Sequence, residues 1–184
     1  MKSTAEPIRV LQVIGAMDRG GAETLVMNLY RNIDRSRIQF DFLVNEKREC
    51  DFDSEIKELG GKIYYIPRYK IFNYFHYKAE CRKFFSNHHY SIVHGHIGLP
   101  AAIYLNIAKH NGAFTIAHSH RANFPLNPSE LAFRICSSSV RNVADYFIAC
   151  SEHAGIDRFG NAITRGPNYA VLKNGVDLNK MHYD

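Results

Sequence analysis

The chain has 184 residues, of which 46% are hydrophobic and 22% are charged. An apolar share of this size excludes an intrinsically disordered chain, and the length suits one domain with a buried core. Lysine and arginine outnumber aspartate and glutamate by 23 to 18, which gives a formal net charge of +5. No apolar run approaches the roughly 18 residues of a membrane-spanning helix, and residues 1–9 lack the apolar segment of a secretory signal. We therefore expect a cytoplasmic protein.

Short β-branched or aromatic runs alternate along the chain with segments that carry apolar residues at helical spacing. In chain order we expect strand Arg9–Ile14, helix Ala22–Asn32, strand Gln39–Val44, helix Asp51–Leu59, strand Lys62–Ile66, helix Asn73–Asn87, strand Ser91–His94, a helix from Pro100, strand Phe114–Ala117, helix Pro128–Asn142, strand Asp145–Ala149, a short helix from Ser151 to Gly160, and strand Ala170–Leu172. Continuous apolar strands are typical of sheets that are covered on both faces. This order predicts an α/β fold: a doubly wound, mainly parallel Rossmann-like sheet with helices on both faces, in one domain over residues 1–184.

Three of the expected helices begin at polar side chains that can accept hydrogen bonds from free backbone N–H groups. Asp51 and Ser151 are expected to cap the second and the last helix. Asn127 and Glu130 have the spacing of a capping box around Pro128.

Ligands of such sheets bind at the carboxyl ends of the strands, near the point where the strand order reverses. The loop after the first strand, Gly15–Gly21, resembles a phosphate-binding loop. It lacks the Lys and Ser or Thr of a P-loop, and it also lacks the G-x-G-x-x-G spacing. Gly20 and Gly21 open a helix whose free N–H groups can bind an anion. The alternative is a flexible turn in which glycine supplies a positive φ.

Two histidine pairs, His94-Gly95-His96 and His118-Ser119-His120, each follow a strand. Histidine there can act as an acid, a base or a ligand, because its pKa lies near neutrality. Two such pairs on neighbouring strands also suit a transition metal. A binuclear hydrolase would need carboxylates in the same loops, and these loops have none, so we expect no metal. The alternative for these histidines, above all for His94, is a hydrogen-bonded structural role.

Basic and aromatic residues are mixed in two further loops, Arg68–Tyr77 and Arg121–Pro125. Such loops suit an anionic ligand, the face of a sugar or a membrane surface. No nucleic-acid partner is expected, because the sequence has no recognition motif and its positive charges are spread out. Four aromatic residues at helical spacing are expected instead in the core: Tyr74, Tyr77, Phe84 and Phe85.

Taken together, these motifs resemble the retaining, nucleotide-sugar-dependent glycosyltransferases of family four, also called glycosyl transferases group 1. The segment Arg9–Leu29 is similar to the opening of that family, in which a strand leads through a Gly-Gly loop into a helix. The matching residues are Gly20, Gly21, Glu23, Asn28 and Leu29, followed in order by Ser91–His96, Thr115–His118, Ala149–Ser151 and Asn174–Asp177.

The resemblance implies the GT-B architecture, in which two Rossmann-like domains face each other across a cleft. The N-terminal domain mainly binds the acceptor and the C-terminal domain binds the nucleotide-sugar donor. The donor-site motifs of the family follow the Asn-Gly-Val-Asp turn, close to which this sequence stops. The resemblance therefore implies an N-terminal, acceptor-side domain whose donor-binding domain is absent from this chain, and a chain that is inactive by itself.

The resemblance also implies roles for particular residues. His118 matches the cleft histidine that contacts the donor sugar or the acceptor, which makes it the catalytic candidate. Gly20 and Gly21 would approach the donor phosphate or the acceptor. Four further residues are candidates for substrate binding: His96, His120, Arg121 and Ser151, the last of which is either close to the cleft or only a helix cap. No metal or other cofactor is implied beyond the nucleotide-sugar co-substrate.

The expected function is thus transfer of a sugar from a nucleotide-sugar donor to a saccharide or lipid-linked acceptor, in polysaccharide or glycolipid biosynthesis. The basic and aromatic loops would rest on the inner face of the membrane. One alternative is a flavodoxin-like module that stands alone and binds a nucleotide or phosphate at Gly20 and Gly21. Another is a metallohydrolase that uses His94, His96, His118 and His120.

Overall fold

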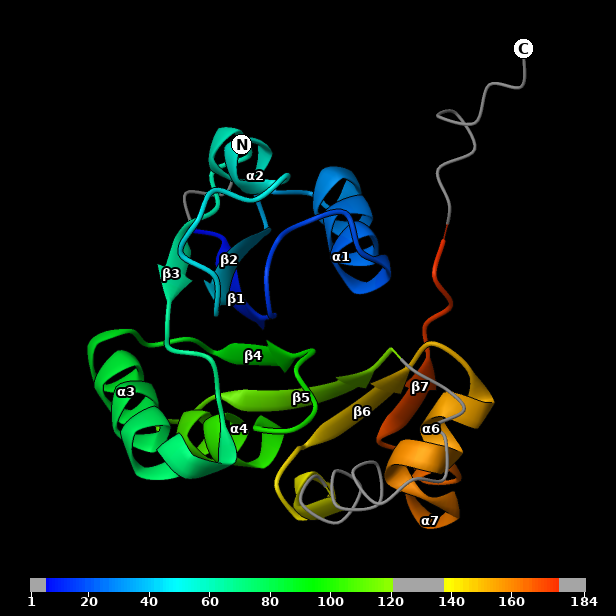
Figure 1. Cartoon of the computed structure of the whole chain (residues 1–184). Coiled ribbons are helices and arrows are strands. Elements are labelled where there is room, and N and C mark those ends of the chain that lie inside the picture. Colours follow the sequence, from blue (N-terminus) through cyan, green and yellow to red (C-terminus); the bar gives the residue numbers. More distant parts are fainter. Residues whose placement is uncertain (1–5, 121–137, 176–184) are drawn as a thin grey trace.

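The computed structural model describes residues 6–120 and 138–175, and its core is one fully parallel sheet of seven strands. The strand order is β3-β2-β1-β4-β5-β6-β7 (Figure 1). The strands are β1 (Ile8–Val13), β2 (Ile38–Val44), β3 (Ile63–Tyr65), β4 (Ile92–Gly95), β5 (Phe114–Ser119), β6 (Tyr146–Ala149) and β7 (Tyr169–Val171). This confirms the predicted Rossmann-like α/β fold.

Helices connect most of the strands. They are α1 (Gly21–Asn32), α2 (Asp53–Glu58), α3 (Tyr74–Asn87), α4 (Ala101–His110), α6 (Glu152–Phe159) and α7 (Asn161–Thr164), with 3-10 turns η1 (Ile71–Asn73) and η2 (Ser139–Asn142). Most of the helix expected from Pro128, with its capping box at Asn127 and Glu130, lies outside the described residues, as does Arg121. None of the helices in the described part of the chain is long and apolar enough to cross a membrane.

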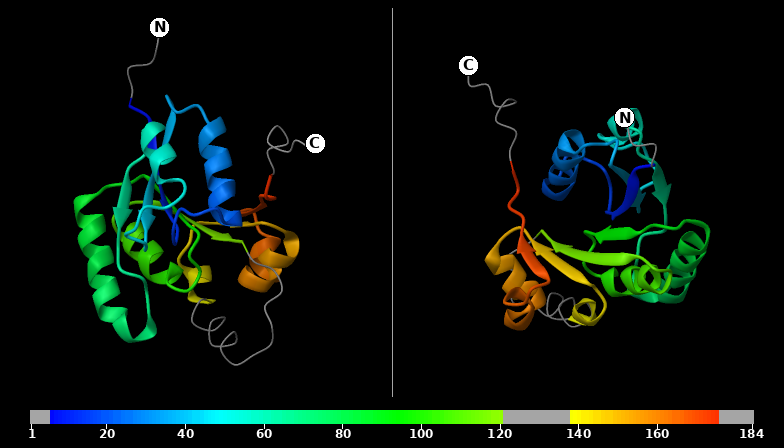
Figure 2. Two further views of the ribbon diagram at one scale, coloured as in Figure 1. Left: turned by 45° about the horizontal axis from the view of Figure 1, so that its top comes forward. Right: turned by 180° about the vertical axis from the view of Figure 1, so that it is seen from behind.

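The two faces of the sheet carry separate apolar cores. On one face, α1 and α2 pack on β1 and β2, where Met27, Tyr30 and Phe42 are fully buried. On the other face, α3, α4 and α6 pack around Val93, Tyr104 and other residues. Figure 2 shows these two helix layers on opposite sides of the strands. Helices therefore cover both faces, as the apolar strands predict.

The predicted caps had different outcomes. The Ser151 hydroxyl accepts a hydrogen bond from the Ala154 N–H at 3.2 Å, so Ser151 caps α6 as predicted. The Asp51 prediction was wrong: α2 begins at Asp53, and Asp51 instead accepts a hydrogen bond from the Arg19 N–H at 3.1 Å. Because Asp51 is recruited by the loop after β1, it ties that loop to the start of α2.

The strand order reverses at β1, whose two neighbours are β2 and β4. In the register of the ladders, Gln12 of β1 lies beside His94 of β4, which lies beside Ile116 of β5. Side chains two residues apart share a face, so His118 is on the same face as His94 and Gln12. This face also carries the α1–α2 core. The fold therefore gathers these polar side chains at the carboxyl end of the central strands.

Candidate functional site

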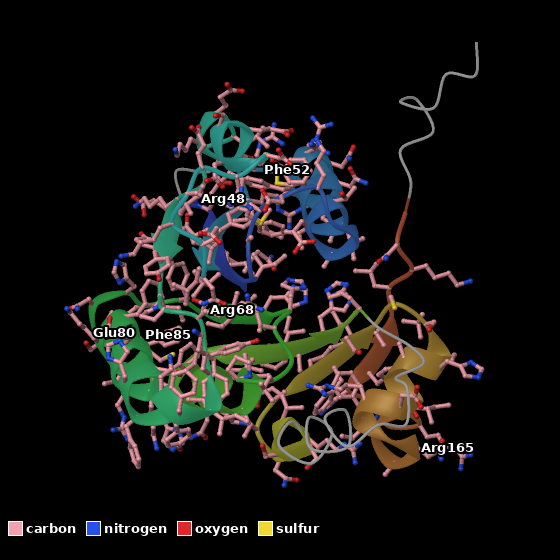
Figure 3. All side chains as sticks on the ribbon, in the orientation of Figure 1. Arg48, Phe52, Arg68, Glu80, Phe85 and Arg165 are labelled. Atoms are coloured by element: carbon pink, nitrogen blue, oxygen red, sulfur yellow. The ribbon has the colours of Figure 1, made fainter. Side chains whose placement is uncertain are left out.

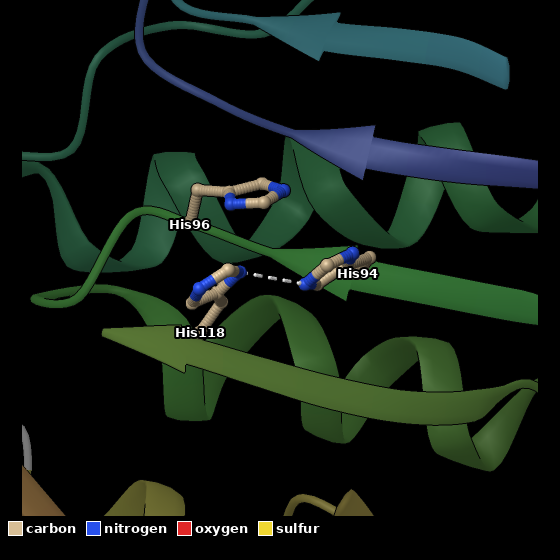
Figure 4. A group of neighbouring side chains, drawn as sticks. All are labelled: His94, His96 and His118. Carbon is tan, nitrogen blue, oxygen red and sulfur yellow. Dashed lines mark hydrogen bonds between the residues drawn. The ribbon is translucent and has the colours of Figure 1, made fainter. Parts of the chain in front are cut away.

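The four histidines of the two sequence pairs form one group, the histidine cluster (His94, His96, His118 and His120). His94 Nε2 lies 3.2 Å from His118 Nδ1, and His96 Nδ1 lies 2.7 Å from His120 Nε2. The rings of His118 and His120 are 4.0 Å apart between centroids. Figure 4 shows His94 and His118 on adjacent parallel strands and His96 just beyond the end of β4. The predicted strand-end histidines thus converge.

One boundary differs from the prediction and changes the position of His118. The fifth strand was expected to end at Ala117, but β5 continues to Ser119, and His118 pairs with Ile148 of β6. The strand extends because β6 continues alongside it, whereas the ladder with β4 ends at Ala117. His118 is consequently a strand residue that is only 5% exposed.

A buried glutamine orients the cluster. Gln12, which is 2% exposed, accepts a hydrogen bond through Oε1 from His96 Nε2 at 2.8 Å. A neutral imidazole carries one proton, so the Nδ1 of His96 is then an acceptor, and His120 Nε2–H donates to it. The Nδ1 of His120 consequently carries a lone pair. The hydrogen bonds fix the tautomers of both rings.

Two ring nitrogens of the cluster are buried without a hydrogen-bond partner among the described residues. They are His118 Nε2 and His120 Nδ1. A buried polar atom left unpaired costs about 1–3 kcal/mol, and such atoms are uncommon in folded proteins. These two atoms are therefore the places at which a ligand could add a hydrogen bond or a coordinate bond.

The rings of the cluster are neutral at pH 7. Burial lowers the pKa of His94 to about 3, of His118 to about 2 and of His120 to about 4. Burial, followed by the neighbouring imidazoles, also holds the pKa of His96 well below its usual 6.5. A neutral ring offers a lone pair and one N–H group but no charge. The cluster can bind hydroxyl groups or metal ions, and it is not a ready proton donor at neutral pH.

A cleft of about 490 Å³ opens at the carboxyl ends of β1 to β4. None of the four histidines lines it, and its nearest lining residue along the chain is Ile97, which follows His96. Its lining includes Gly15, Asn45, Glu46, Arg68 and Tyr69, together with residues 97–100. Figure 3 places Arg68 near the middle of the molecule. The mixture of amide, carboxylate, guanidinium and phenol groups suits a polyhydroxyl ligand with some negative charge.

The start of α1 does not have the geometry of a flexible glycine turn. Gly20 has φ −108°, and neither Gly15 nor Gly21 is among the glycines with positive φ. A Cβ atom on Gly20 would lie 2.2 Å from Oε2 of Glu23, so the absence of a side chain at Gly20 lets the Glu23 carboxylate lie against the backbone there. The carboxylate of Glu23 lies over the helix start, where burial raises its pKa. The positive-φ alternative was wrong for this loop.

The other residues predicted from the sequence lie outside the histidine cluster. Ser151 is engaged as the cap of α6. The segment that follows β7 approaches α1, where Asn28 Nδ2 donates to the Gly175 carbonyl at 3.3 Å. Tyr77, Phe84 and Phe85 are core residues as predicted, whereas Tyr74 is only partly buried.

Three residues of the site were not singled out from the sequence. Gln12 is a polar residue inside an apolar strand, which is a usable signal for a buried hydrogen-bond partner. Asn45 and Glu46 were missed because they follow β2, whereas the site was expected in the loops after the first, fourth, fifth and sixth strands. The Arg68–Tyr77 loop was singled out, and Arg68 and Tyr69 do line the cleft.

Known protein sequences are similar to this chain over most of its length. Residues 19–180 match the family described as Glycosyltransferase Family 4. EpsF of Bacillus subtilis (strain 168), which is named as a glycosyltransferase, is 34% identical over 175 residues, which are 92% of this chain and 46% of EpsF. The chain thus spans about half the length of this relative.

Solved structures share the fold at low sequence identity. HepE of Anabaena, crystallised with UDP and glucose, superimposes with a TM-score of 0.68 at 16% identity, over 94% of this chain and 46% of HepE. MurG of Acinetobacter baumannii gives a TM-score of 0.55 at 13% identity, over 93% of this chain and 46% of MurG. Because the family match extends over most of the chain and EpsF is similar over nearly all of it, the chain belongs to Glycosyltransferase Family 4.

Proposed function

We propose that this chain is the acceptor-side half of a glycosyltransferase that moves a sugar, with retention of configuration, from a nucleotide-sugar donor to a saccharide or lipid-linked acceptor. The product would belong to a polysaccharide or glycolipid. The observation that carries the proposal is the pair of unpartnered buried nitrogens, His118 Nε2 and His120 Nδ1, in a member of this family whose strands β1 to β4 end at a polar cleft.

The acceptor would bind in the cleft lined by Asn45, Glu46, Arg68 and Tyr69. Amide and carboxylate groups pair with sugar hydroxyls, and Arg68 can pair with a phosphate or carboxylate of the acceptor. Tyr69 can stack on the face of a sugar ring. Arg121, which lies outside the described residues, is proposed as a further acceptor contact.

His118 would act as a neutral hydrogen-bonding residue. Burial lowers its pKa to about 2, so at pH 7 it cannot transfer a proton as an imidazolium. Its Nε2 can instead bond to a hydroxyl of the sugar or acceptor and hold it in the orientation needed for transfer. His120 and His96 would assist through the hydrogen bond between them.

The nucleotide diphosphate would leave toward the start of α1, on the face where the acceptor hydroxyl arrives. The Gly20 N–H donates to the Asp18 carbonyl at 2.8 Å, so the backbone N–H groups from Gly21 onward would stabilise the developing negative charge while Gly20 lets the diphosphate approach. Glu23 now covers this helix start, so its side chain would turn away when a diphosphate binds. No metal ion is needed in this scheme.

A donor-binding domain outside this chain would complete the enzyme, and the 184-residue chain by itself is proposed to be inactive. HepE, which shares the fold, binds UDP-glucose, and this supports a nucleotide-sugar donor. The competing proposal is a module that binds a nucleotide or phosphate alone. Calorimetry of this chain with UDP and with inorganic diphosphate separates the two, since tight binding by the chain alone would favour the module.

The test of the site is glycosyl transfer by a protein that contains this chain and its donor-binding domain. His118→Ala is expected to lower kcat/KM by about 10- to 100-fold through loss of one hydrogen bond in a dry site. Gly21→Val should also lower it, by covering the N–H groups at the helix start. His110→Ala, at the exposed end of α4, is the control. Unchanged rates in both site variants would refute the assignment.

Peripheral membrane contact is proposed through an aromatic patch (Ile71, Phe72 and Phe75). These side chains are 74%, 86% and 84% exposed. Their exposure is unfavourable, because the removal of an apolar side chain from water normally lowers the free energy. Lys70 and Lys78 flank the patch, and the Lys70 ammonium lies 5.6 Å from the centre of the Phe72 ring. Apolar side chains ringed by lysines fit an anionic lipid surface.

Co-sedimentation with vesicles tests this contact. Phosphatidylglycerol vesicles should bind the protein, and phosphatidylcholine vesicles should bind it much less. The double change Phe72→Ser and Phe75→Ser is expected to weaken binding by about 10-fold or more. Phe114→Ser, which changes an exposed phenylalanine at the start of β5, should have no effect. If Phe114→Ser weakened vesicle binding as much as the double change does, the assignment of membrane contact to this patch would be wrong.

A further inference from the structure

Three imidazoles of the histidine cluster are spaced as ligands of one ion. One nitrogen from each of His94, His96 and His118 lies within 4.8 Å of the other two (Figure 4). The 3.2 Å separation of His94 Nε2 and His118 Nδ1 is close to the roughly 3.3 Å between two nitrogens on a tetrahedral ion with bonds of about 2.0 Å. Small rotations of the side chains would bring the third nitrogen to the same centre.

The number and type of these ligands also suit metal binding. A neutral imidazole supplies one lone pair to an ion, and His94, His96 and His118 each offer one nitrogen to a common centre. Three protein ligands leave one position of a tetrahedral ion open, and a water molecule can fill it.

The surroundings supply the orienting contact that such sites normally have. Histidines that bind metals usually donate their other N–H group to a carbonyl or carboxylate, which fixes the tautomer and the ring. The Nε2–H of His96 donates to Oε1 of Gln12, a buried residue of β1. The Nδ1 lone pair of His96 therefore points into the cluster, where it accepts from His120 Nε2–H, and an ion bound there would replace that hydrogen bond.

We propose that His94, His96 and His118 form a binding site for one divalent ion of the late transition series, such as Zn²⁺, Co²⁺, Ni²⁺ or Cu²⁺. Imidazole is a preferred ligand of these ions, whereas Mg²⁺ and Ca²⁺ require oxygen ligands, which this set does not provide. Gln12 is the positioning residue of the site. The site follows from the side chains alone and does not depend on the proposed transfer reaction.

Occupation of the site has a consequence that does rest on the proposed function. An ion bound by His118 engages the ring that is proposed to orient the sugar hydroxyl. Because the ion binds Nδ1 of His118, it would turn the ring and move Nε2 away from the hydroxyl, and it would inhibit transfer rather than promote it.

Titration of the metal-free 184-residue chain with Co²⁺ tests the site directly. Histidine-bound Co²⁺ of low coordination number has intense visible absorption bands, and we expect these bands to saturate at one ion per chain. Zn²⁺ should displace the Co²⁺ and abolish the bands. Zn²⁺ should also raise the unfolding temperature, because it binds the folded state.

Matched variants locate the ion. His96→Ala should weaken Co²⁺ binding by more than about 100-fold, and Gln12→Leu by about 10- to 100-fold, as expected for loss of an orienting contact. His110→Ala, at an exposed histidine of α4, should bind like the unaltered chain. Circular dichroism checks that each variant is folded. If His96→Ala does not fold, the nitrogen chemical shifts of His94, His96 and His118 in the unaltered chain must change with Zn²⁺ while those of His110 do not.

The site is supported if the Co²⁺ bands saturate at one ion per chain and if Co²⁺ binding is lost in His96→Ala but kept in His110→Ala. The site is overturned if the bands are absent or if His96→Ala binds Co²⁺ as tightly as the unaltered chain. It is also overturned if Zn²⁺ changes the nitrogen chemical shifts of exposed histidines only. Inhibition of transfer is measured separately on the longer protein. If Zn²⁺ binds but the transfer rate does not change, the site stands and the proposed role of His118 fails.

Discussion

Two buried polar groups lie at opposite ends of the same sheet, and they differ in how completely their atoms are paired. Toward the amino ends of the strands, the carboxylate of Asp41 is 1% exposed. It accepts hydrogen bonds from the Arg9 guanidinium, from the Lys62 N–H at 2.7 Å and from the Tyr90 hydroxyl at 2.9 Å. We call this set the Asp41 cluster. At the carboxyl ends, the histidine cluster buries His94 and His118, half-buries His96 and His120, and leaves two nitrogens unpaired among the described residues.

The difference indicates what each cluster contributes. Each carboxylate oxygen of Asp41 has at least two donors, so nothing in it awaits a ligand and its contribution is stability. The histidine cluster carries the cost of unpaired buried atoms, and a protein bears such costs at binding sites. Stability and function are thus separated along the length of the strands.

A fall in pH is expected to have the largest effect on the free energy of unfolding, and the two clusters should respond to it in different pH ranges. The histidine pKa values are depressed by burial, so the unfolded chain takes up protons near pH 6.5 while the folded chain does not until about pH 4 to 2. The free energy of unfolding therefore falls as the pH falls from 6.5, by about 1.4 kcal/mol per pH unit for each such ring.

The Asp41 cluster responds only at lower pH. Burial raises the pKa of Asp41, but the hydrogen bonds from Arg9, the Lys62 N–H and Tyr90 outweigh it and hold the pKa below 3.8. Its contribution is present above that pH and is lost below it. Urea unfolding with a chelator present, between pH 7 and 4.5, measures the slope. A flat profile over this range would show that the rings are not buried neutral.

Removal of the Asp41 carboxylate should produce the largest mutational loss. Asp41→Ala leaves the Lys62 N–H and the Tyr90 hydroxyl without their acceptor, and it leaves Arg9, whose side chain is 32% exposed, without its ion pair. We expect about 3 kcal/mol of lost unfolding free energy at pH 7. Asp41→Asn, which keeps the shape and removes the charge, should lose less. Near-wild-type stability of Asp41→Ala would mean that the Asp41 cluster is not stabilising.

The two clusters also differ in how far they could be predicted from the sequence. The fold follows from local periodicity, because continuous apolar strands alternate with amphipathic helices. The histidine pairs were visible as strand-end residues. Their convergence required the strand order β1-β4-β5 and the register that sets Gln12 beside His94, and neither is encoded locally. The partners Arg9, Asp41 and Tyr90 are far apart in sequence and carry no motif.

Helix and loop boundaries show the same limit. Asp51 is an ordinary capping residue by type, but a tertiary hydrogen bond to the Arg19 N–H recruits it. Asn45 and Glu46 line the cleft because β2 ends beside β1. Local signals therefore predicted which elements form, and tertiary pairing decided which polar residues face the cleft.

A smaller loss is expected from Gly95→Ala, which tests how tightly the histidine cluster is supported. A Cβ atom on Gly95 would lie 2.3 Å from the Tyr104 hydroxyl oxygen and 2.8 Å from its ring. Tyr104 is fully buried and donates to the Ile97 carbonyl, so it cannot move freely. We expect about 2 kcal/mol of lost stability. Gly15→Ala, where a Cβ would meet nothing within 4 Å, should stay within about 0.5 kcal/mol.

Among substitutions within the two clusters, the smallest change in stability is expected from His118→Leu, and it separates the two clusters most sharply. Leucine removes the unpaired Nε2 of His118, but it also deprives His94 Nε2 of its partner. One unpaired buried atom replaces another, so the free energy of unfolding should change by less than about 1 kcal/mol at pH 7. Urea unfolding at pH 7, beside Asp41→Ala, measures the contrast. A loss as large as that of Asp41→Ala would make the histidine cluster a structural element, whereas an unchanged stability combined with lost Co²⁺ binding marks its atoms as reserved for a ligand.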